Sequence, residues 1–491
     1  MVCAHASRIS RRRSGNRARG NAHSRGRHAP VLQRGGPRRS AGGRFLPRVL
    51  RHLVRPAYPQ RRGPRPASCD GRTVTGLSRG ALAAYAVVAL PLAAGALPLY
   101  IHVASIYSDS YGAQLAGIGI ALLVARAADA LVDPWLGILV DRLRRPRLVI
   151  FAGVSLLALG LVLVFHPPWR GTAGIAWLML SLLPAYLGYS SAAIAHLALG
   201  ATFGANSADR ARVAVWREGF GLVGILLASA APQFVAFDAA AALAQSSLVF
   251  AVVAPLGVAL ALSAVPTSQG VAPAARPSWT DALRQFTRAP FAPLLAAFVV
   301  NGIANALPAT LALLFVADVL GAPQFGAQFL LVYFAGGAIG LPAWLALARR
   351  LGSWRAWQLS MLLGAAAFVG ATALDPGDLL PFLVVCVASG LMLGGDLALP
   401  AALLTDALRE RGHEAAAASY FGVWTLAAKL TLAAAAGIGL PLVSALGYVP
   451  GQPATAAPLQ LAYCLIPCAL KVFAAGLLPL TVRPRPQGAL P

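Results

Sequence analysis

The chain has 491 residues, of which 58% are hydrophobic and only 12% are charged, and its mean hydropathy is +0.67. A soluble domain carries about twice that share of charged residues. The composition therefore excludes an ordinary soluble protein and predicts a chain that crosses a membrane many times.

The net charge of +25 is concentrated at one end of the chain. Residues 1–75 contain nineteen Arg and one Asp, and the rest of the chain carries a net charge of only +7. This stretch is rich in Arg, Gly, Pro and Ser and lacks hydrophobic periodicity, so we expect it to be disordered and outside the fold. Three interpretations stay open: a misassigned start with the true start near Val74, a basic tail that touches anionic lipid, and a transit peptide. The positive charge thus gives no reason to expect nucleic acid as a partner.

Twelve apolar segments, each long enough to cross a bilayer, follow along the chain. They cover residues 81–106, 113–140, 147–165, 173–200, 213–237, 241–265, 289–317, 325–348, 356–374, 379–405, 416–444 and 458–482. The sequence therefore predicts an all-α membrane protein with twelve transmembrane helices. A polar stretch at 266–288 divides it into two halves, residues 76–265 and 289–482, and residues 483–491 form a tail.

The arginines predict how the helices are oriented. Loops on one side, together with the C-terminal tail, hold sixteen Arg, whereas loops on the other side hold only Arg170. Because Lys and Arg accumulate in cytoplasmic loops, we expect both termini to lie in the cytoplasm of a cell that carries the protein in its inner (cell) membrane.

The second segment places three ionisable side chains inside an apolar run. At 100° per residue, Arg126, Asp129 and Asp133 fall within an arc of roughly 60° on one helix face. A charge in the middle of a bilayer costs about 2.5–3.5 kcal/mol even on the mildest scale, and two acids one turn apart repel each other. The cluster is explained if a cation or a proton visits the acids and leaves again, or if it only locks two helices together.

Lys429 lies midway along the eleventh segment, roughly 20 Å from either end. Its side chain is too short to snorkel to the interface, so it needs an acid or water inside the bundle. We expect Asp129 or Asp133 as its partner, with Asp396 as the third candidate. A static ion pair between two helices is the alternative to a role in a charge relay.

Several weaker candidates for the lining of a central cavity follow from their positions in the segments. They are Tyr186, Tyr189, His196, Asn301, Asn305 and Trp424. Packing is an equal or better explanation for His196 and Trp424, and helix–helix hydrogen bonding is an equal one for the two asparagines. The five cysteines show no metal-ligand spacing, and no phosphate loop or nucleophile elbow is present. We therefore expect neither a cofactor nor an enzyme.

Residues 124–142, VARAADALVDPWLGILVDR, resemble the second-helix signature of the glycoside–pentoside–hexuronide:cation symporters, the melibiose-permease-like branch of the major facilitator superfamily. The signature reads R-x-x-D-A-x-x-D-P-x-x-G-x-x-x-D-R, and its last part, Gly137, Asp141 and Arg142, is similar to the superfamily's loop between helices two and three. The resemblance implies a major facilitator fold of two six-helix bundles. It also implies that Asp129 and Asp133 coordinate the coupling cation, with a lysine at the position of Lys429 nearby.

The donor set is compatible with either Na⁺ or H⁺. Pro134 lacks an N–H, so the carbonyl oxygen of Ala130 has no helical partner and can join the two carboxylates as a hard ligand. Alternatively, one carboxyl group holds a proton. The sequence leaves both coupling ions open.

The part of the family pattern that grips sugar is missing. Sugar carriers of this family use acids in the first and fourth helices, but residues 81–106 contain no charged side chain and the fourth-helix position is Ala193. We therefore expect a small or amphiphilic organic substrate that is not a simple sugar, carried by a monomer in contact with membrane lipid. The expected function is cation-coupled symport by alternating access. A lipid or lysolipid carrier of the same fold and a non-transporting membrane sensor are the alternatives.

Overall fold

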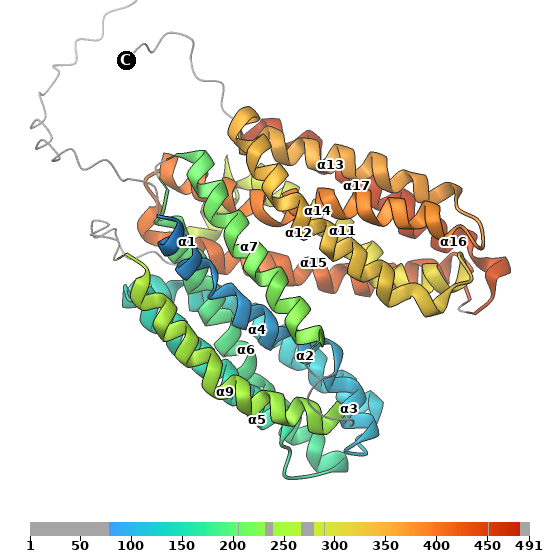
Figure 1. The fold of residues 1–491 in the computed structure, drawn as a ribbon, viewed down its shortest axis with the longest axis horizontal. Coiled ribbons are helices and arrows are strands. Elements are labelled where there is room, and N and C mark those ends of the chain that lie inside the picture. Colours follow the sequence, from blue (N-terminus) through green and yellow to red (C-terminus); the bar gives the residue numbers. More distant parts are fainter. Residues whose placement is uncertain are drawn as a thin grey trace, which may run out of the picture. The chain divides into compact units, whose positions relative to one another are not determined.

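The structure is a computed structural model, and it describes residues 78–481 except 205, 231–238, 267–278, 289 and 450. The compact unit that contains them runs from Asp70 to Pro491. The Arg-rich stretch of residues 1–75 and the tail 483–491 lie outside the described residues. Everything described is helix, turn or connecting loop, with no strand in that part of the chain (Figure 1).

The first six predicted segments each coincide with helix. They correspond to α1 (Arg79–Ala86), α2 (Ala89–Ile101) and α3 (Val103–Asp109) for the first segment, then α4 (Leu115–Leu143), α5 (Pro146–Phe165), α6 (Gly171–Ala201), α7 (Ser207–Ala230) and α9 (Ala239–Ala264). The first segment is thus broken into three pieces, and α2 contains Pro98, which removes one helical hydrogen bond. Helix α7 begins six residues before the predicted span.

The second half follows the same plan. Its helices are α11 (Phe291–Asp318), α12 (Gly326–Leu351), α13 (Ser353–Val369), α14 (Leu379–Glu410), α15 (Ala417–Ala445) and, for the last segment, α16 (Ala457–Gln460), a π-helical turn (Leu461–Leu465) and α17 (Ile466–Leu477). In Figure 1 the blue-to-green helices gather in one bundle and the yellow-to-red helices in another.

Ten helical spans among the described residues, some of them made of two or more of these helices, are long and apolar enough to cross a membrane by length and composition alone. Helices α4 and α7 fall outside that criterion because they carry the charged residues of the second and fifth segments, including Asp129 and Arg217. Both are nonetheless long, at 29 and 24 residues, which corresponds to about 43 and 36 Å. Each of the twelve predicted segments is therefore mainly helical over its described residues.

The described part of the stretch between the halves contains a helix that the sequence did not predict. Helix α10 (Trp279–Phe286) lies inside the segment 266–288 that was expected to be a loop. Its Phe286 ring packs 5.8 Å from the Phe291 ring at the start of α11 and 5.4 Å from the Tyr420 ring on α15. This short helix therefore anchors the connection against the second bundle.

Small residues allow the helices of each bundle to approach closely. A Cβ atom at Gly153 of α5 would lie 2.7 Å from the carbonyl oxygen of Gly188 on α6, and one at Gly394 of α14 would lie 2.8 Å from that of Gly337 on α12. Side chains larger than glycine are excluded at both crossings. Such contacts are typical of membrane helices, where packing replaces the hydrophobic effect.

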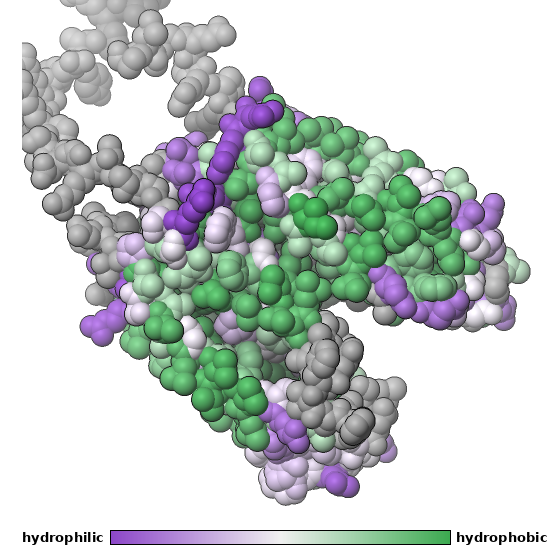
Figure 2. All heavy atoms as spheres, in the orientation of Figure 1, coloured by the Kyte–Doolittle hydropathy of each residue, from purple (hydrophilic) through white to green (hydrophobic). Residues whose placement is uncertain are grey.

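The outer surface is apolar. Figure 2 shows hydrophobic residues over the visible sides of the helices and hydrophilic residues near their ends. Exposed leucines and valines are numerous on α9, among them Leu256 and Leu260, which are 65% and 75% exposed. A surface of this kind is stable against lipid hydrocarbon and not against water.

Candidate cation site

The site forms where α4 of the first bundle meets α15 of the second. A Cβ atom at Gly422 would lie 2.6 Å from the carbonyl oxygen of Asp133, and one at Gly137 would lie 2.9 Å from Cα of Ser419. The two backbones therefore touch along one seam. Lys429 follows Gly422 by two helical turns, so it lies on the same face of α15 and leans back towards α4.

Lys429 lies between the two predicted acids. Its Nζ atom is 2.7 Å from Oδ2 of Asp129 and 2.8 Å from both carboxylate oxygens of Asp133. The acids are buried, with side chains that are 5% and 0% exposed, and Lys429 is 18% exposed. The expectation that Lys429 pairs with these acids is confirmed, and the partners are 300 and 296 residues apart in the chain.

Ser190 of α6 completes the cluster, and the sequence reasoning missed it. The Ser190 hydroxyl donates to Oδ1 of Asp129 at 2.7 Å and accepts from Nζ of Lys429 at 2.8 Å. Ser190 lies one helical turn after Tyr186, on the helix face that was proposed to line a cavity. This four-residue spacing could have identified Ser190 from the sequence. Its hydroxyl adds a third oxygen donor beside the two carboxylates.

The cluster has unused capacity for a ligand. Two carboxyl groups face one ammonium group, and Oδ2 of Asp133 is buried without a hydrogen bond of normal geometry, although Lys429 lies within ion-pair distance. A buried acceptor in this condition is costly unless another partner sometimes fills it. Carboxylate and hydroxyl oxygens are suitable ligands for a hard cation.

The remaining residues of the first bundle surround this cluster. Tyr186 is buried beside Arg126 and Asp129, while Arg126 itself is exposed. Tyr189 lies within electrostatic range of both acids. The structure thus places Tyr186 beside Arg126 and Asp129 and brings Tyr189 within electrostatic range of both acids, while the role of the two tyrosines in lining a cavity stays a prediction.

Asp396 belongs to a different cluster, so it is not the partner of Lys429. It forms a 2.6 Å ion pair with Lys471 of α17, and it accepts hydrogen bonds from Trp357 at 3.0 Å and Asn305 at 3.1 Å. Lys471 also donates to Oδ1 of Asn301 at 3.1 Å. The two asparagines therefore hydrogen-bond to the Asp396–Lys471 pair and join helices. Of the two interpretations from the sequence, this is helix–helix hydrogen bonding.

Two further cavity candidates are packing residues. His196 is 2% exposed, its ring lies 4.3 Å from that of Tyr85, and Nε2 lies 2.9 Å from the Tyr85 carbonyl oxygen. Trp424 stacks on Phe298 with ring centroids 3.9 Å apart. Neither side chain is directed at the acids.

The loop motif at the end of α4, Gly137, Asp141 and Arg142, provides a second link between the two bundles. Asp141 accepts hydrogen bonds from the backbone N–H groups of Ala418 and Ser419, at 3.1 and 2.7 Å, and so stabilises the start of α15. At the second seam between the bundles, where α14 meets α7, Asp406 forms an ion pair with Arg210 and accepts a hydrogen bond from Ser207 at 2.6 Å. Arg142 is exposed.

These features define a multi-pass integral membrane protein built from two helical bundles, with a buried charge cluster at their interface. The family model described as MFS/sugar transport protein matches residues 82–481, and the chain belongs to this family. No curated protein sequence matches the chain.

Solved structures show the same fold. A bacterial homologue of the iron transporter ferroportin, in an outward-facing state, is 16% identical with a TM-score of 0.64, and the match covers 82% of this chain and 98% of that one. The E. coli fucose:proton symporter FucP is 15% identical with a TM-score of 0.55, over 81% of this chain and 99% of that one. The protein therefore has the major facilitator fold, as predicted.

Proposed function

We propose that this protein is a secondary active transporter that couples the entry of a cation, Na⁺ or H⁺, to the symport of a small organic solute by alternating access. Within the MFS/sugar transport family we assign it to the glycoside–pentoside–hexuronide:cation symporter branch, on the motif from Arg126 to Arg142. The observation that carries the proposal is the position of the Lys429 ammonium group between the carboxylates of Asp129 and Asp133.

The lysine occupies the place that a coupling cation would take. When a cation binds the carboxylates, it neutralises them and competes with the ammonium group, so the Lys429 pairs weaken. Because the acids belong to the first bundle and the lysine to the second, this exchange changes the attraction between the bundles. Binding of the ion is thereby linked to the rocking motion that alternating access requires.

The solute is less defined than the ion. One similar structure is of a fucose:proton symporter and another is of a homologue of an iron transporter, so the fold itself serves unlike cargoes. The first segment of this chain lacks the acid with which sugar carriers bind hydroxyl groups. We therefore propose a small organic solute other than a simple sugar, with a lipid or lysolipid carried by the same coupling as the second candidate.

The orientation follows from the arginine distribution. If the Arg-rich loops face the cytoplasm, the contacts made by Asp141 and Asp406 lie at the cytoplasmic side of the bundles. They would then hold that side closed while the other side admits ion and solute.

An uptake screen in proteoliposomes tests the proposal. A mixture of unlabelled metabolites is offered under an imposed Na⁺ gradient, an imposed H⁺ gradient, or either gradient collapsed by an ionophore, and the vesicle contents are analysed by mass spectrometry. We expect at least one solute to accumulate under only one of the gradients. Uptake that no gradient changes would contradict coupling, and the absence of any uptake would favour the non-transporting sensor.

A further inference from the structure

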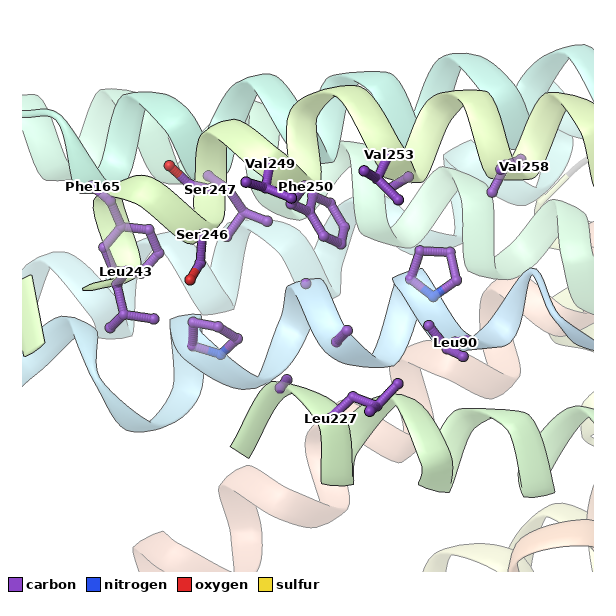
Figure 3. Close-up of a pocket in the computed structure, with 18 of the residues that line it drawn as sticks. Leu90, Phe165, Leu227, Leu243, Ser246, Ser247, Val249, Phe250, Val253 and Val258 are labelled. Carbon is purple, nitrogen blue, oxygen red and sulfur yellow. The ribbon is translucent and has the colours of Figure 1, made fainter. Parts of the chain in front are cut away.

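An elongated apolar cavity lies in the first bundle, away from the charge cluster. Its volume is about 440 Å³, and it is lined by residues of α2, α5, α7 and α9, with no residue of α4. Figure 3 shows Leu90 on α2, Leu227 on α7 and Phe250 on α9 around this space. The only polar side chains in its lining are those of Ser246 and Ser247.

The dimensions of the cavity fit one hydrocarbon chain. The lining on α9 extends from Leu243 to Val258, which corresponds to about 22 Å along the helix. The cavity is thus elongated along α9, as the binding of an extended hydrocarbon chain requires.

The cavity is continuous with the lipid-facing surface. Val249 and Val253 line it and are also 62% and 61% exposed, and they lie on the same helix as the outward-facing Leu256 and Leu260. A chain from the surrounding bilayer can therefore enter between α2 and α9 without crossing the protein.

A polar atom marks one end of the cavity. The Ser246 hydroxyl is buried and has no hydrogen-bond partner among the described residues, whereas Ser247 donates to the carbonyl oxygen of Ala244 at 2.7 Å. In Figure 3 the Ser246 hydroxyl points into the cavity. Ser246 lies seven residues, about 10 Å, from the start of α9, near the Leu243 end of the cavity.

We infer that this cavity binds one acyl chain of a bilayer glycerophospholipid. The chain lies along α2 and α9, and an ester oxygen of the lipid accepts a hydrogen bond from the Ser246 hydroxyl. The lipid fills the gap between these helices and stabilises the first bundle. It is not the transported solute, because the cavity lacks α4 and hence the acids of the cation site. The inference rests on the membrane fold and holds whether or not the proposed symport is correct.

Photo-crosslinking tests the inference on the full-length protein. The protein is reconstituted in vesicles of phosphatidylcholine with a diazirine group in the acyl chain, illuminated, and analysed by peptide mass spectrometry. We expect labels concentrated on α2 and α9 around Leu90, Gly95 and Phe250. Equal labelling of all outward-facing helices would show ordinary boundary lipid only and would overturn the inference.

Two glycines provide a matched pair of variants. A Cβ atom meets nothing within 4 Å at Gly257 of α9, which lines the cavity, or at Gly119 of α4, which does not. We expect Gly257→Phe to fill the cavity and lower the labelling of α2 at least fivefold, while Gly119→Phe leaves it unchanged. Unchanged labelling in Gly257→Phe would contradict the inference.

Ser246→Ala tests the polar end of the cavity. We expect labelling to fall about fivefold, which is the loss of affinity that corresponds to one net hydrogen bond. Full labelling in Ser246→Ala would remove the ester contact from the inference. Asp133→Asn separates the site from transport, because labelling should stay at the level of the unsubstituted protein even where coupling is lost. Movement of the labelled lipid between leaflets that depends on Asp133 would instead identify the lipid as cargo and overturn the inference.

Discussion

Two lysines inside the helical bundles show how similar side chains differ in their capacity for function. Lys471 pairs with Asp396, whose oxygens also accept from Trp357, Ser360 and Asn305, and all these residues lie in one bundle. Lys429 instead crosses to the other bundle and leaves Oδ2 of Asp133 without a hydrogen bond. The fully bonded pair is suited to holding four helices together, whereas the incompletely bonded pair is suited to exchange.

Ser190 is predicted to tune the affinity for the cation. Ser190→Ala removes one oxygen donor and the hydrogen bond to Asp129, so we expect the half-saturating cation concentration for uptake to rise about fivefold to tenfold. Ser191→Ala is the matched control, because the Ser191 hydroxyl bonds to the Gly188 carbonyl oxygen in its own helix. Equal effects of the two substitutions would exclude Ser190 from the site.

Lys429 is predicted to compete with the cation. Lys429→Ala leaves two carboxyl groups without their ammonium partner, which should destabilise the protein by about 3–5 kcal/mol in the absence of the coupling ion. Because the competitor is gone, the coupling ion should raise the thermal midpoint more in this variant than in the unsubstituted protein. Lys471→Ala serves as control, since it should be destabilised without rescue by the ion. An identical ion response in Lys429→Ala and the unsubstituted protein would contradict competition.

At the scale of helices, the two bundles meet along α4–α15 and α7–α14. The apolar runs in the sequence were enough to predict that these four helices exist. Gly137 and Gly422 allow α4 and α15 to approach closely. The contacts could not be predicted, because Lys429 and Asp133 are 296 residues apart and periodicity assigns a face but not a partner. The break of the first span and the short helix α10 were also missed, since both depend on local packing that a hydropathy pattern does not contain.

The Arg210–Asp406 pair is predicted to keep this side of the interface closed. We expect Arg210→Ala and Asp406→Ala each to speed the labelling of a cysteine introduced into the central cavity from the side of the Arg-rich loops. The double substitution should be no faster than the single ones, with a coupling energy of about 0.5–3 kcal/mol in a double-mutant cycle. Strictly additive rates would show that the two side chains do not act together.

At the scale of the whole molecule, the two bundles divide the work. The first bundle supplies the acids and Ser190, and the second supplies the lysine that crosses to them. This asymmetry is visible in the sequence, because the eighth segment, the counterpart of the second, contains no acid. It did not predict that Asp396 would be bonded within the second bundle, because the apolar run around it carries no information about α13 and α17.

The central claim is that Asp133 binds the ion that drives transport, and Asp133→Asn tests it most directly. Once a substrate is known, proteoliposomes containing this variant are compared with the unsubstituted protein in two assays, gradient-driven accumulation and solute exchange at equilibrium. The amide keeps the shape of the side chain but removes its charge, so we expect accumulation to fall to the level without a gradient while exchange continues. Full gradient-driven accumulation in Asp133→Asn would contradict the account.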